Sequence, residues 1–216
     1  MIQGVLFDLD GTLVNTLDDI AGAMNRALRL HGLSEYPVEK YRYLVGNGAK
    51  ILSQRAVGEY QELAEAVLKD YQAWYETHNQ VLSAPYAGIP ELLESLKEMG
   101  ISCMVLSNKP DADTRHVIEH YFGKDLFMLV HGQREGVPLK PDPTAALQMA
   151  QEAGILPENM LYLGDTSVDI TCALRAGMHA IGVTWGFRDR RELEEAGAEA
   201  VIDHPEEILQ RIATIL

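Results

Sequence analysis

Short apolar runs alternate with helical patterns along most of this chain, and that rhythm restricts the fold more than any other feature. Six runs have the length and composition of buried strands, at residues 4–7, 103–106, 127–130, 160–163, 180–183 and 200–202. Helical patterns lie between most of the later runs, at residues 89–99, 111–121, 144–153 and 168–176. Glycine directly follows three of these helical patterns, where helices commonly end. Strands that alternate with helices in this way predict an α/β fold with a doubly wound parallel sheet.

The stretch between the first two predicted strands breaks this rhythm. It is far longer than one crossover helix needs, and it carries helical patterns at residues 17–30, 49–57 and 63–81. Turn residues separate these patterns, among them the sequence Gly46-Asn47-Gly48. We therefore expect residues 16–82 to form an inserted α-helical cap domain, and residues 1–15 and 83–216 to form the α/β core. A helical insertion after the first strand is positioned to act as a lid over the carboxyl end of the sheet.

The charge balance excludes some classes of partner. The 216 residues include 32 acidic and 18 basic side chains, which gives a net charge of −14. Such a charge argues against nucleic acid or an anionic membrane surface as a partner. No apolar run approaches membrane-spanning length, and Asp8 and Asp10 interrupt the early apolar stretch that a signal peptide would need. Cys103 and Cys172 stand among apolar or small residues and suit reduced thiols, so we expect a cytoplasmic protein.

Two aspartates follow the first predicted strand in the motif Asp8-Leu9-Asp10-Gly11-Thr12. Ligands of parallel sheets bind at the carboxyl ends of strands, and carboxylates there are costly unless a cation or a reaction uses them. Asp8 can attack phosphorus as a nucleophile, and Asp10, on the same side of an extended backbone, can act as general acid and base. Gly11 permits close approach of the backbone, and Thr12 adds a hydroxyl and an amide. A helix cap or an Asx-turn explains a single aspartate as well, but the pair favours catalysis.

Polar residues also end the second predicted strand. Ser107 and Asn108 place a hydroxyl and an amide where they can hold a phosphate oxygen, and Lys109 can add positive charge. The alternatives are an N-cap for the helix that follows Pro110 and a solvated lysine.

Two later segments supply further charged side chains. Lys140 lies between two prolines in residues 138–141, which hold its backbone in place. Its ammonium can neutralise phosphate and carboxylate charge, although a surface loop lysine is an equal alternative. Asp165 follows the fourth predicted strand, and Asp169 lies one helical turn beyond it. Carboxylates at this spacing suit Mg²⁺, and a helix cap at Asp165 or Thr166 is compatible with metal binding.

These four segments, in this order and each at the end of an apolar run, resemble the motifs of the haloacid dehalogenase superfamily. The resemblance covers essentially the whole chain, including the core strands and the helical insertion. Dehalogenases need no acid for the leaving group, so the presence of Asp10 favours phosphatase chemistry. The resemblance implies that Asp8 is the nucleophile, Asp10 the general acid and base, Ser107 the phosphate-binding hydroxyl and Lys140 the bridging lysine. It also implies that Asp8, the backbone carbonyl of Asp10 and Asp165 bind Mg²⁺ directly. Asp169 would support the ion through a water molecule, or by a contact with one of the direct ligands.

Within this superfamily, the loop Gly46-Asn47-Gly48 resembles the cap loop of phosphoglycolate phosphatases. Its glycines let backbone amides approach a small anion and Asn47 can donate a hydrogen bond, although a plain helix–helix turn is the local alternative. The resemblance implies a small phosphorylated metabolite as the partner, 2-phosphoglycolate first, and we expect a monomer or homodimer. The predicted substrate contacts are Thr12, Asn108, Lys109, Gly46, Asn47 and Gly48.

Other functions remain open at this point. Discrimination among phosphate esters lies in the cap, so pyrophosphate, a nucleotide or a sugar phosphate are alternative substrates, and a phosphomutase is an alternative activity. A phospho-accepting signalling domain also combines acids, a hydroxyl residue and a lysine, but it lacks an insertion of this size.

The chain departs from the family at Asn15, where an acid is usual. Trp185 and Phe187 either wall the site or pack in the core.

Overall fold

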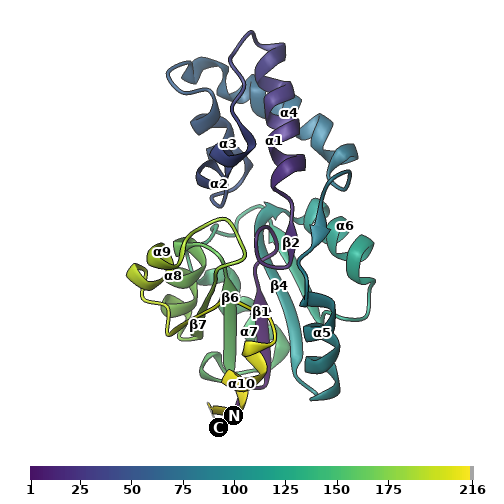
Figure 1. The fold of residues 1–216 in the computed structure, drawn as a ribbon, viewed down its shortest axis with the longest axis vertical. Coiled ribbons are helices and arrows are strands. Elements are labelled where there is room, and N and C mark those ends of the chain that lie inside the picture. The colour runs from purple at the N-terminus through teal and green to yellow at the C-terminus, as the bar shows by residue number, and fades with distance from the viewer. Residues whose placement is uncertain (215–216) are drawn as a thin grey trace.

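The structure is a computed structural model that describes residues 1–214, and its two parts are stacked along the long axis (Figure 1). One part is a sheet with helices on both faces, and the other is a helical bundle above one end of that sheet. The predicted α/β fold with a doubly wound parallel sheet is confirmed.

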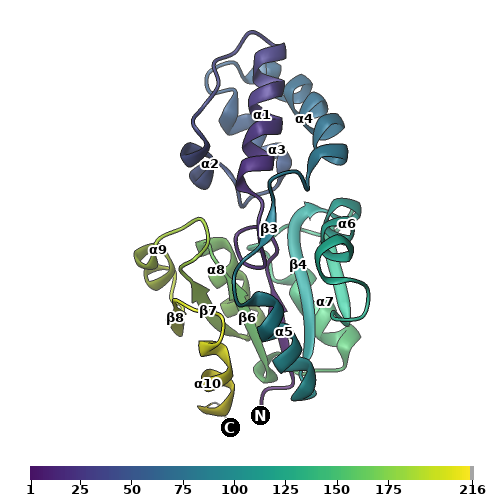
Figure 2. The same cartoon turned by 45° about the vertical axis from the view of Figure 1, so that its right-hand side comes forward.

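The sheet has six parallel strands in the order β5-β4-β1-β6-β7-β8. Phe7, the last residue of the central strand, pairs with Val105 on one side and with Leu163 on the other. The carboxyl ends of β4, β1 and β6 therefore meet at one edge of the sheet, which faces the helical bundle (Figure 2). The strands are β1 Gly4–Phe7, β4 Ser102–Pro110, β5 Leu129–Gln133, β6 Met160–Gly164, β7 His179–Val183 and β8 Ala200–Ile202.

Alternation of apolar side chains along the strands builds a core on each face of the sheet. Val5 and Phe7 belong to the cluster with α5, α6 and α10, whereas Leu6 belongs to the cluster with α7, α8 and α9. Burial of both faces explains why these strands are unbroken apolar runs in the sequence. The helices are α5 Ile89–Glu98, α6 Asp111–Phe122, α7 Thr144–Ala153, α8 Ser167–Ala176, α9 Arg190–Glu195 and α10 Glu207–Thr214, and a 3₁₀ turn, η2, covers Pro157–Asn159.

The helical bundle encloses a third apolar core, in which Met24, Tyr41 and Tyr75 are buried. Phe187, from the α/β part, joins this cluster, so the two parts share an apolar contact. The bundle consists of α1 Leu17–Leu30, α2 Val38–Leu44, α3 Ala49–Ala56 and α4 Ala64–His78, with a 3₁₀ turn, η1, at Gln61–Leu63.

Two adjacent linkers join the parts. The short strands β2 Val14–Asn15 and β3 Ala84–Pro85 pair in antiparallel fashion where the chain enters and leaves the bundle (Figure 2). The buried carboxylate of Asp19 accepts hydrogen bonds from the amides of Leu82 and Ser83 at 2.9–3.0 Å and from the Ser83 hydroxyl at 2.6 Å. Because the predicted boundaries fall at these linkers, we propose residues 16–82 as a cap domain, with residues 1–15 and 83–216 as the core domain. Residues 215 and 216 lie outside the described part.

Several elements differ from the sequence prediction. α2 and α10 were not predicted, because each buries only two residues, and two apolar positions are too few to show a helical repeat. The helix predicted to reach residue 81 ends at His78. β4 continues to Pro110 with an irregularity after Leu106, so Ser107 lies within the strand rather than beyond it. No helix formed by residues 1–214 combines the length and apolar character needed to cross a bilayer.

Candidate active site

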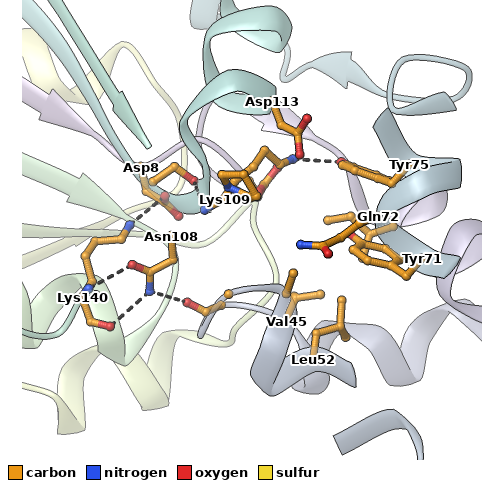
Figure 3. Close-up of a pocket in the computed structure, with 17 residues that line it drawn as sticks. Asp8, Val45, Leu52, Tyr71, Gln72, Tyr75, Asn108, Lys109, Asp113 and Lys140 are labelled. Carbon is orange, nitrogen blue, oxygen red and sulfur yellow. Dashed lines mark hydrogen bonds and ion pairs between the residues drawn. The ribbon is translucent and has the colours of Figure 1, made fainter. Parts of the chain in front are cut away.

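The residues predicted to carry catalysis lie at the carboxyl edge of the central strands. Asp8 follows β1, Ser107 lies on β4, and Lys140 comes from the loop after β5. All three line one pocket together with Asp10, and the opposite wall of that pocket belongs to the helical bundle (Figure 3). Asp165, which follows β6, lies close enough for one of its oxygens to be within 4.8 Å of an oxygen of Asp8. The parallel register thus gathers groups that are more than 150 residues apart in sequence.

Lys140 forms the charged centre of the site. Its Nζ donates to Asp8 Oδ1 at 2.8 Å, to Asp169 Oδ1 at 2.7 Å and to the carbonyl of Leu106 at 3.1 Å. Its side chain is only 2% exposed. Burial lowers the pKa of Lys140, but the negative charges of Asp169 and Asp8 outweigh this effect and hold the pKa well above its usual value. The ammonium therefore stays charged at neutral pH.

The two carboxylates at the strand tips have perturbed ionisation. Burial raises the pKa of Asp8 to about 7, the charge of Asp169 adds to this shift, and Lys140 opposes it. Burial, followed by the charges of Asp169 and Asp8, raises the pKa of Asp165 well above its usual value. Three carboxylates share the ammonium of Lys140, and the more distant charge of Arg188 only partly opposes the shift of Asp165, so acidic groups outnumber the cations at this site.

A divalent cation fits this arrangement. Asp8, Asp165 and Asp169 each offer one carboxylate oxygen, and these atoms all lie within 4.8 Å of one another. All three side chains are buried, so their repulsion is poorly screened by water. Oxygen ligands of this kind suit Mg²⁺. The donor set and the unbalanced charge therefore both fit the predicted ion.

Asp165 is held by its surroundings in one orientation. Its Oδ2 accepts a hydrogen bond from the amide of Phe187 at 2.7 Å, and its Oδ1 accepts one from the Thr12 hydroxyl at 3.3 Å. A Cβ at Gly11 or Gly186 would collide with the Asp165 side chain, and Gly11 also has a φ of 93°. The sequence analysis predicted that Thr12 contacts the substrate, and in the structure its hydroxyl donates to Asp165. We propose that Thr12 positions this carboxylate.

Asp169 serves the helix and the site together. Its Oδ2 accepts from the hydroxyl of Thr166 at 2.7 Å and from the amide of Thr166 at 3.2 Å, which closes a capping box at the start of α8. Its other oxygen pairs with Lys140. Thr166 is thus the N-cap, one of the two residues that the sequence analysis considered for this role, and Asp169 contributes to the cap while it also contacts Lys140.

Asp10 lies at the edge of the pocket, with a side chain that is 19% exposed. Its Oδ1 accepts from the Thr16 hydroxyl at 2.7 Å and from Lys109 Nζ at 2.6 Å. Lys109 also donates to the hydroxyl of Tyr75, on α4, at 2.8 Å. Lys109 was predicted to contact substrate, and here its ammonium is bound to Asp10 and to the cap. Tyr75 was not predicted, because an aromatic residue on the apolar stripe of a helix usually indicates packing alone.

Ser107 and Asn108 have different surroundings. The Ser107 oxygen accepts from the amide of Lys109 at 3.2 Å, so its hydroxyl hydrogen remains able to donate to a ligand in the pocket. The Asn108 amide group donates to the carbonyls of Gly46 at 3.0 Å and Lys140 at 3.1 Å, and its oxygen accepts from the Lys140 amide at 2.9 Å (Figure 3). Asn108 therefore fixes the backbone of Lys140 and ties it to the cap loop. Asn108 also lines the pocket, and the predicted contact between its side chain and phosphate stays a prediction.

The cap forms the outer wall of the pocket. Gly46 and Gly48 line it, as does Leu52 of α3, and α4 adds two tyrosines and Gln72 (Figure 3). Asn47 was predicted to face the substrate, but its side-chain oxygen accepts from Arg55 at 2.8 Å. The glycines of this loop thus lie where the sequence analysis expected them, whereas the Asn47 side chain is bound within the cap.

Two arginines that gave no sequence signal join the cap to the loop after β7. Arg42 of α2 donates to the carbonyls of Gly186 at 2.7 Å and Phe187 at 3.0 Å. Arg188 donates to the carbonyl of Val45 at 3.1 Å. Trp185 donates from its indole to the carbonyl of Thr12 at 3.0 Å, so this loop also touches the catalytic motif. The loop that holds Asp165 is therefore fixed from both the core and the cap.

The class of protein is an α/β enzyme with a doubly wound sheet, paired aspartates after its central strand, a buried lysine and a helical bundle over the carboxyl edge of the sheet. A family model described as "Haloacid dehalogenase-like hydrolase" matches residues 5–183. The chain belongs to this family, which confirms the resemblance found in the sequence.

Several relatives are similar along almost the whole chain. Phosphoglycolate phosphatase 1 of Pseudomonas aeruginosa is 32% identical over 213 residues, which covers 95% of this chain and 78% of that protein. N-acetylmuramic acid 6-phosphate phosphatase of the same organism is 30% identical and covers 96% of this chain and 93% of that protein. The crystal structure of a "predicted phosphoglycolate phosphatase" from Haemophilus somnus 129pt has a TM-score of 0.91 at 28% identity, with 97% of each chain covered. The chain is a phosphatase, so the alternative of a signalling domain is set aside.

Proposed function

We propose that this phosphatase hydrolyses phosphate monoesters through a phosphoaspartate on Asp8, with Mg²⁺ as its cofactor. The observation that carries the proposal is the buried contact between Asp8 Oδ1 and Lys140 at 2.8 Å, beside a second carboxylate at the same pocket. Within residues 1–214, Asp8 Oδ2 has no hydrogen-bond donor, so this oxygen is available to attack a substrate in the pocket. The lysine orients the nucleophile and offsets part of the negative charge that would repel a phosphate.

In the first step, an oxygen of Asp8 forms a bond to phosphorus, and the bond between phosphorus and the ester oxygen breaks. Asp10 gives its proton to the departing oxygen, so the alcohol leaves as a neutral molecule. Ser107 donates to a phosphoryl oxygen, and Lys140 balances the charge that develops on the phosphoryl group. Lys109, at 2.6 Å from Asp10, pairs with that carboxylate once its proton has left.

In the second step, a water molecule attacks phosphorus, and Asp10 takes one of its protons. The bond between phosphorus and Asp8 breaks, which releases inorganic phosphate and restores both carboxyl groups to their starting states. Closure of the cap limits the pocket to the water that this step consumes. The contacts of Tyr75 with Lys109 and of Asn108 with Gly46 support such a closed arrangement.

Asp8, Asp165 and Asp169 would hold Mg²⁺, together with the backbone carbonyl of Asp10. When bound, the ion would neutralise charge on the phosphoryl group and on the gathered carboxylates. Thr12 and Phe187 keep Asp165 oriented toward that position, and Lys140 holds Asp169 beside it by a hydrogen bond.

For the substrate we propose a small phosphorylated metabolite, with 2-phosphoglycolate as the first candidate. The names of the relatives and the cap loop support this choice. Gly48 and Ala49 line the pocket at the start of α3, where the positive end of the helix dipole favours an anion such as the glycolate carboxylate. A sugar phosphate is the second candidate, since one relative is named for such a substrate and α4 adds an aromatic wall to the pocket.

The test measures phosphate release from 2-phosphoglycolate, pyrophosphate, a nucleoside monophosphate, a sugar phosphate and p-nitrophenyl phosphate. We expect turnover in the presence of Mg²⁺, loss of turnover with a chelator, and no turnover by Asp8→Asn. Asp125→Asn removes an equal charge from an exposed position and is the matched control. Substantial turnover by Asp8→Asn would reject the nucleophile, and turnover in chelator would reject the metal. A phosphorylated isomer that forms without free phosphate would indicate a mutase.

A further inference from the structure

Asp113 is a pocket residue that the proposed reaction does not use. It lies in the first turn of α6 and lines the pocket near Lys109 and Tyr75 (Figure 3). Its side chain is partly buried, yet within residues 1–214 no group forms a hydrogen bond or an ion pair with its carboxylate. Partly buried carboxylates without partners are unfavourable, so an unused one in a ligand pocket indicates a group that a ligand satisfies.

The cations nearest to the reaction centre already have partners. Lys140 is bound to Asp8 and Asp169, and Lys109 is bound to Asp10 and Tyr75. Burial raises the pKa of Asp113, and the nearby charge of Lys109 opposes that shift without forming an ion pair with the carboxylate. This end of the pocket therefore presents negative charge to the substrate.

Gln72 adds a second polar group across the pocket. It projects from α4 toward the core between the tyrosine pair and the catalytic strand (Figure 3). Its amide can both donate and accept, whereas Asp113 accepts only. Leu52 and Tyr71 complete this wall with apolar surface. The combination suits a short carbon chain that ends in a hydrogen-bond donor.

We propose that Asp113 and Gln72 form a subsite for a hydroxyl or amino group on the alcohol part of the substrate. This inference rests on the proposed phosphatase function and concerns its substrate class. The pocket then has two chemically distinct walls: the glycine loop beside α3 favours a carboxylate, and the wall of Asp113 and Gln72 favours a donor. The enzyme accordingly hydrolyses phosphate esters of amino and hydroxy alcohols in addition to 2-phosphoglycolate.

A matched set of two-carbon esters tests the subsite. O-phosphoethanolamine, 2-hydroxyethyl phosphate, ethyl phosphate and 2-phosphoglycolate differ only at the end remote from phosphate. The kcat/KM of each ester is divided by that of ethyl phosphate for the same variant, so that a general loss of activity cancels. We expect Asp113→Asn to lower the ratio for O-phosphoethanolamine by about tenfold, because a charge-assisted hydrogen bond is lost. The same change should raise the ratio for 2-phosphoglycolate, because a like charge is removed.

Gln72→Leu provides an independent variant and should lower the ratio for 2-hydroxyethyl phosphate. Asp125→Asn, an exposed acid outside the pocket, should change none of the ratios. Equal ratios in the wild type and in Asp113→Asn would overturn the subsite, as would hydrolysis of 2-phosphoglycolate without any hydrolysis of O-phosphoethanolamine. Failure of the wild type to hydrolyse these esters and also p-nitrophenyl phosphate and a sugar phosphate, with Mg²⁺ present, would instead overturn the phosphatase mechanism on which the inference rests.

Discussion

The hydroxyl of Tyr75 lies 2.8 Å from the ammonium of Lys109, and this contact connects the cap to the catalytic strand. Lys109 pairs in turn with Asp10 at 2.6 Å, so one ammonium lies between a cap side chain and the proposed general acid. Tyr75 stacks on Tyr71, with ring centroids 5.2 Å apart, which fixes the direction of its hydroxyl. The position of α4 is therefore coupled to the position of Lys109.

Removal of the Tyr75 hydroxyl should weaken catalysis more than binding. In Tyr75→Phe, the buried ammonium of Lys109 loses one acceptor, and we expect kcat to fall by about fivefold, equivalent to about 1 kcal/mol. KM should change less, because the ring still lines the pocket. Steady-state kinetics check both values, and Tyr60→Phe, at an exposed position of the cap, is the control. A change confined to KM would contradict a positioning role for Tyr75.

The raised pKa of Asp8 predicts how stability depends on pH without metal. An aspartate whose pKa is about 7 when folded, against 3.8 when unfolded, destabilises the folded state above pH 7, and this penalty disappears as the pH falls toward 4. In chelator, Asp8→Asn should therefore increase the free energy of unfolding at pH 8, on the order of 2 kcal/mol, and by less at pH 5. Urea unfolding at both pH values measures the difference. The same gain at both would show that Asp8 titrates normally.

Lys140 should matter for stability as well as for catalysis. Replacing it by alanine leaves Asp8 and Asp169 without their cation in a buried site, and breaking such a pair costs roughly 3–5 kcal/mol. We expect Lys140→Ala to unfold at much lower urea concentration at pH 8 in chelator. Lys97→Ala, on the exposed side of α5, removes the same charge without a buried partner. Equal midpoints for the two variants would argue that the carboxylates are already neutral.

The glycine loop offers a test of the contact between the cap and the site. Gly48 has a φ of 83°, and a Cβ there would lie 3.3 Å from both the carbonyl oxygen of Asn108 and the side chain of Leu139. Gly32 has a φ of 70°, but a Cβ there meets open space. Both alanine variants should lose about 1 kcal/mol of stability.

Only Gly48→Ala should also raise KM, because it displaces the loop that lines the pocket, and a change of about fivefold is reasonable for a small misplacement. The increase should be larger for 2-phosphoglycolate than for p-nitrophenyl phosphate. Similar increases for both esters would argue against a role of this loop in specificity.

The sequence predicted the residues at the strand ends better than the residues whose roles depend on contact between the cap and the core. Asp8 and Asp165 each follow a buried strand, and parallel pairing alone brings such tips together, so their proximity could be predicted from local patterns. Tyr75, Arg42 and Asp113 gave no signal, because their roles depend on how the cap rests on the core, and no local periodicity encodes that docking.

Side chains next to the predicted motifs also had partners that the sequence did not reveal. The Asn108 amide binds backbone carbonyls, and the Thr12 hydroxyl binds a carboxylate. Both groups are hydrogen-bond donors and could bind phosphate. Only the packed structure determines which acceptor lies within hydrogen-bonding distance of each.

The paired linkers have a consequence for how the chain folds. The central strand must find a partner far along the sequence, since Gly4 pairs with Ser102, and closing so long a loop is slow when the intervening chain is disordered. The helical insertion brings its own ends together, because Val14 pairs with Pro85 and Asp19 binds the amides of Leu82 and Ser83. If the insertion folds early, it would thus bring the first strand close to the strand with which it pairs. The insertion would then speed assembly of the sheet.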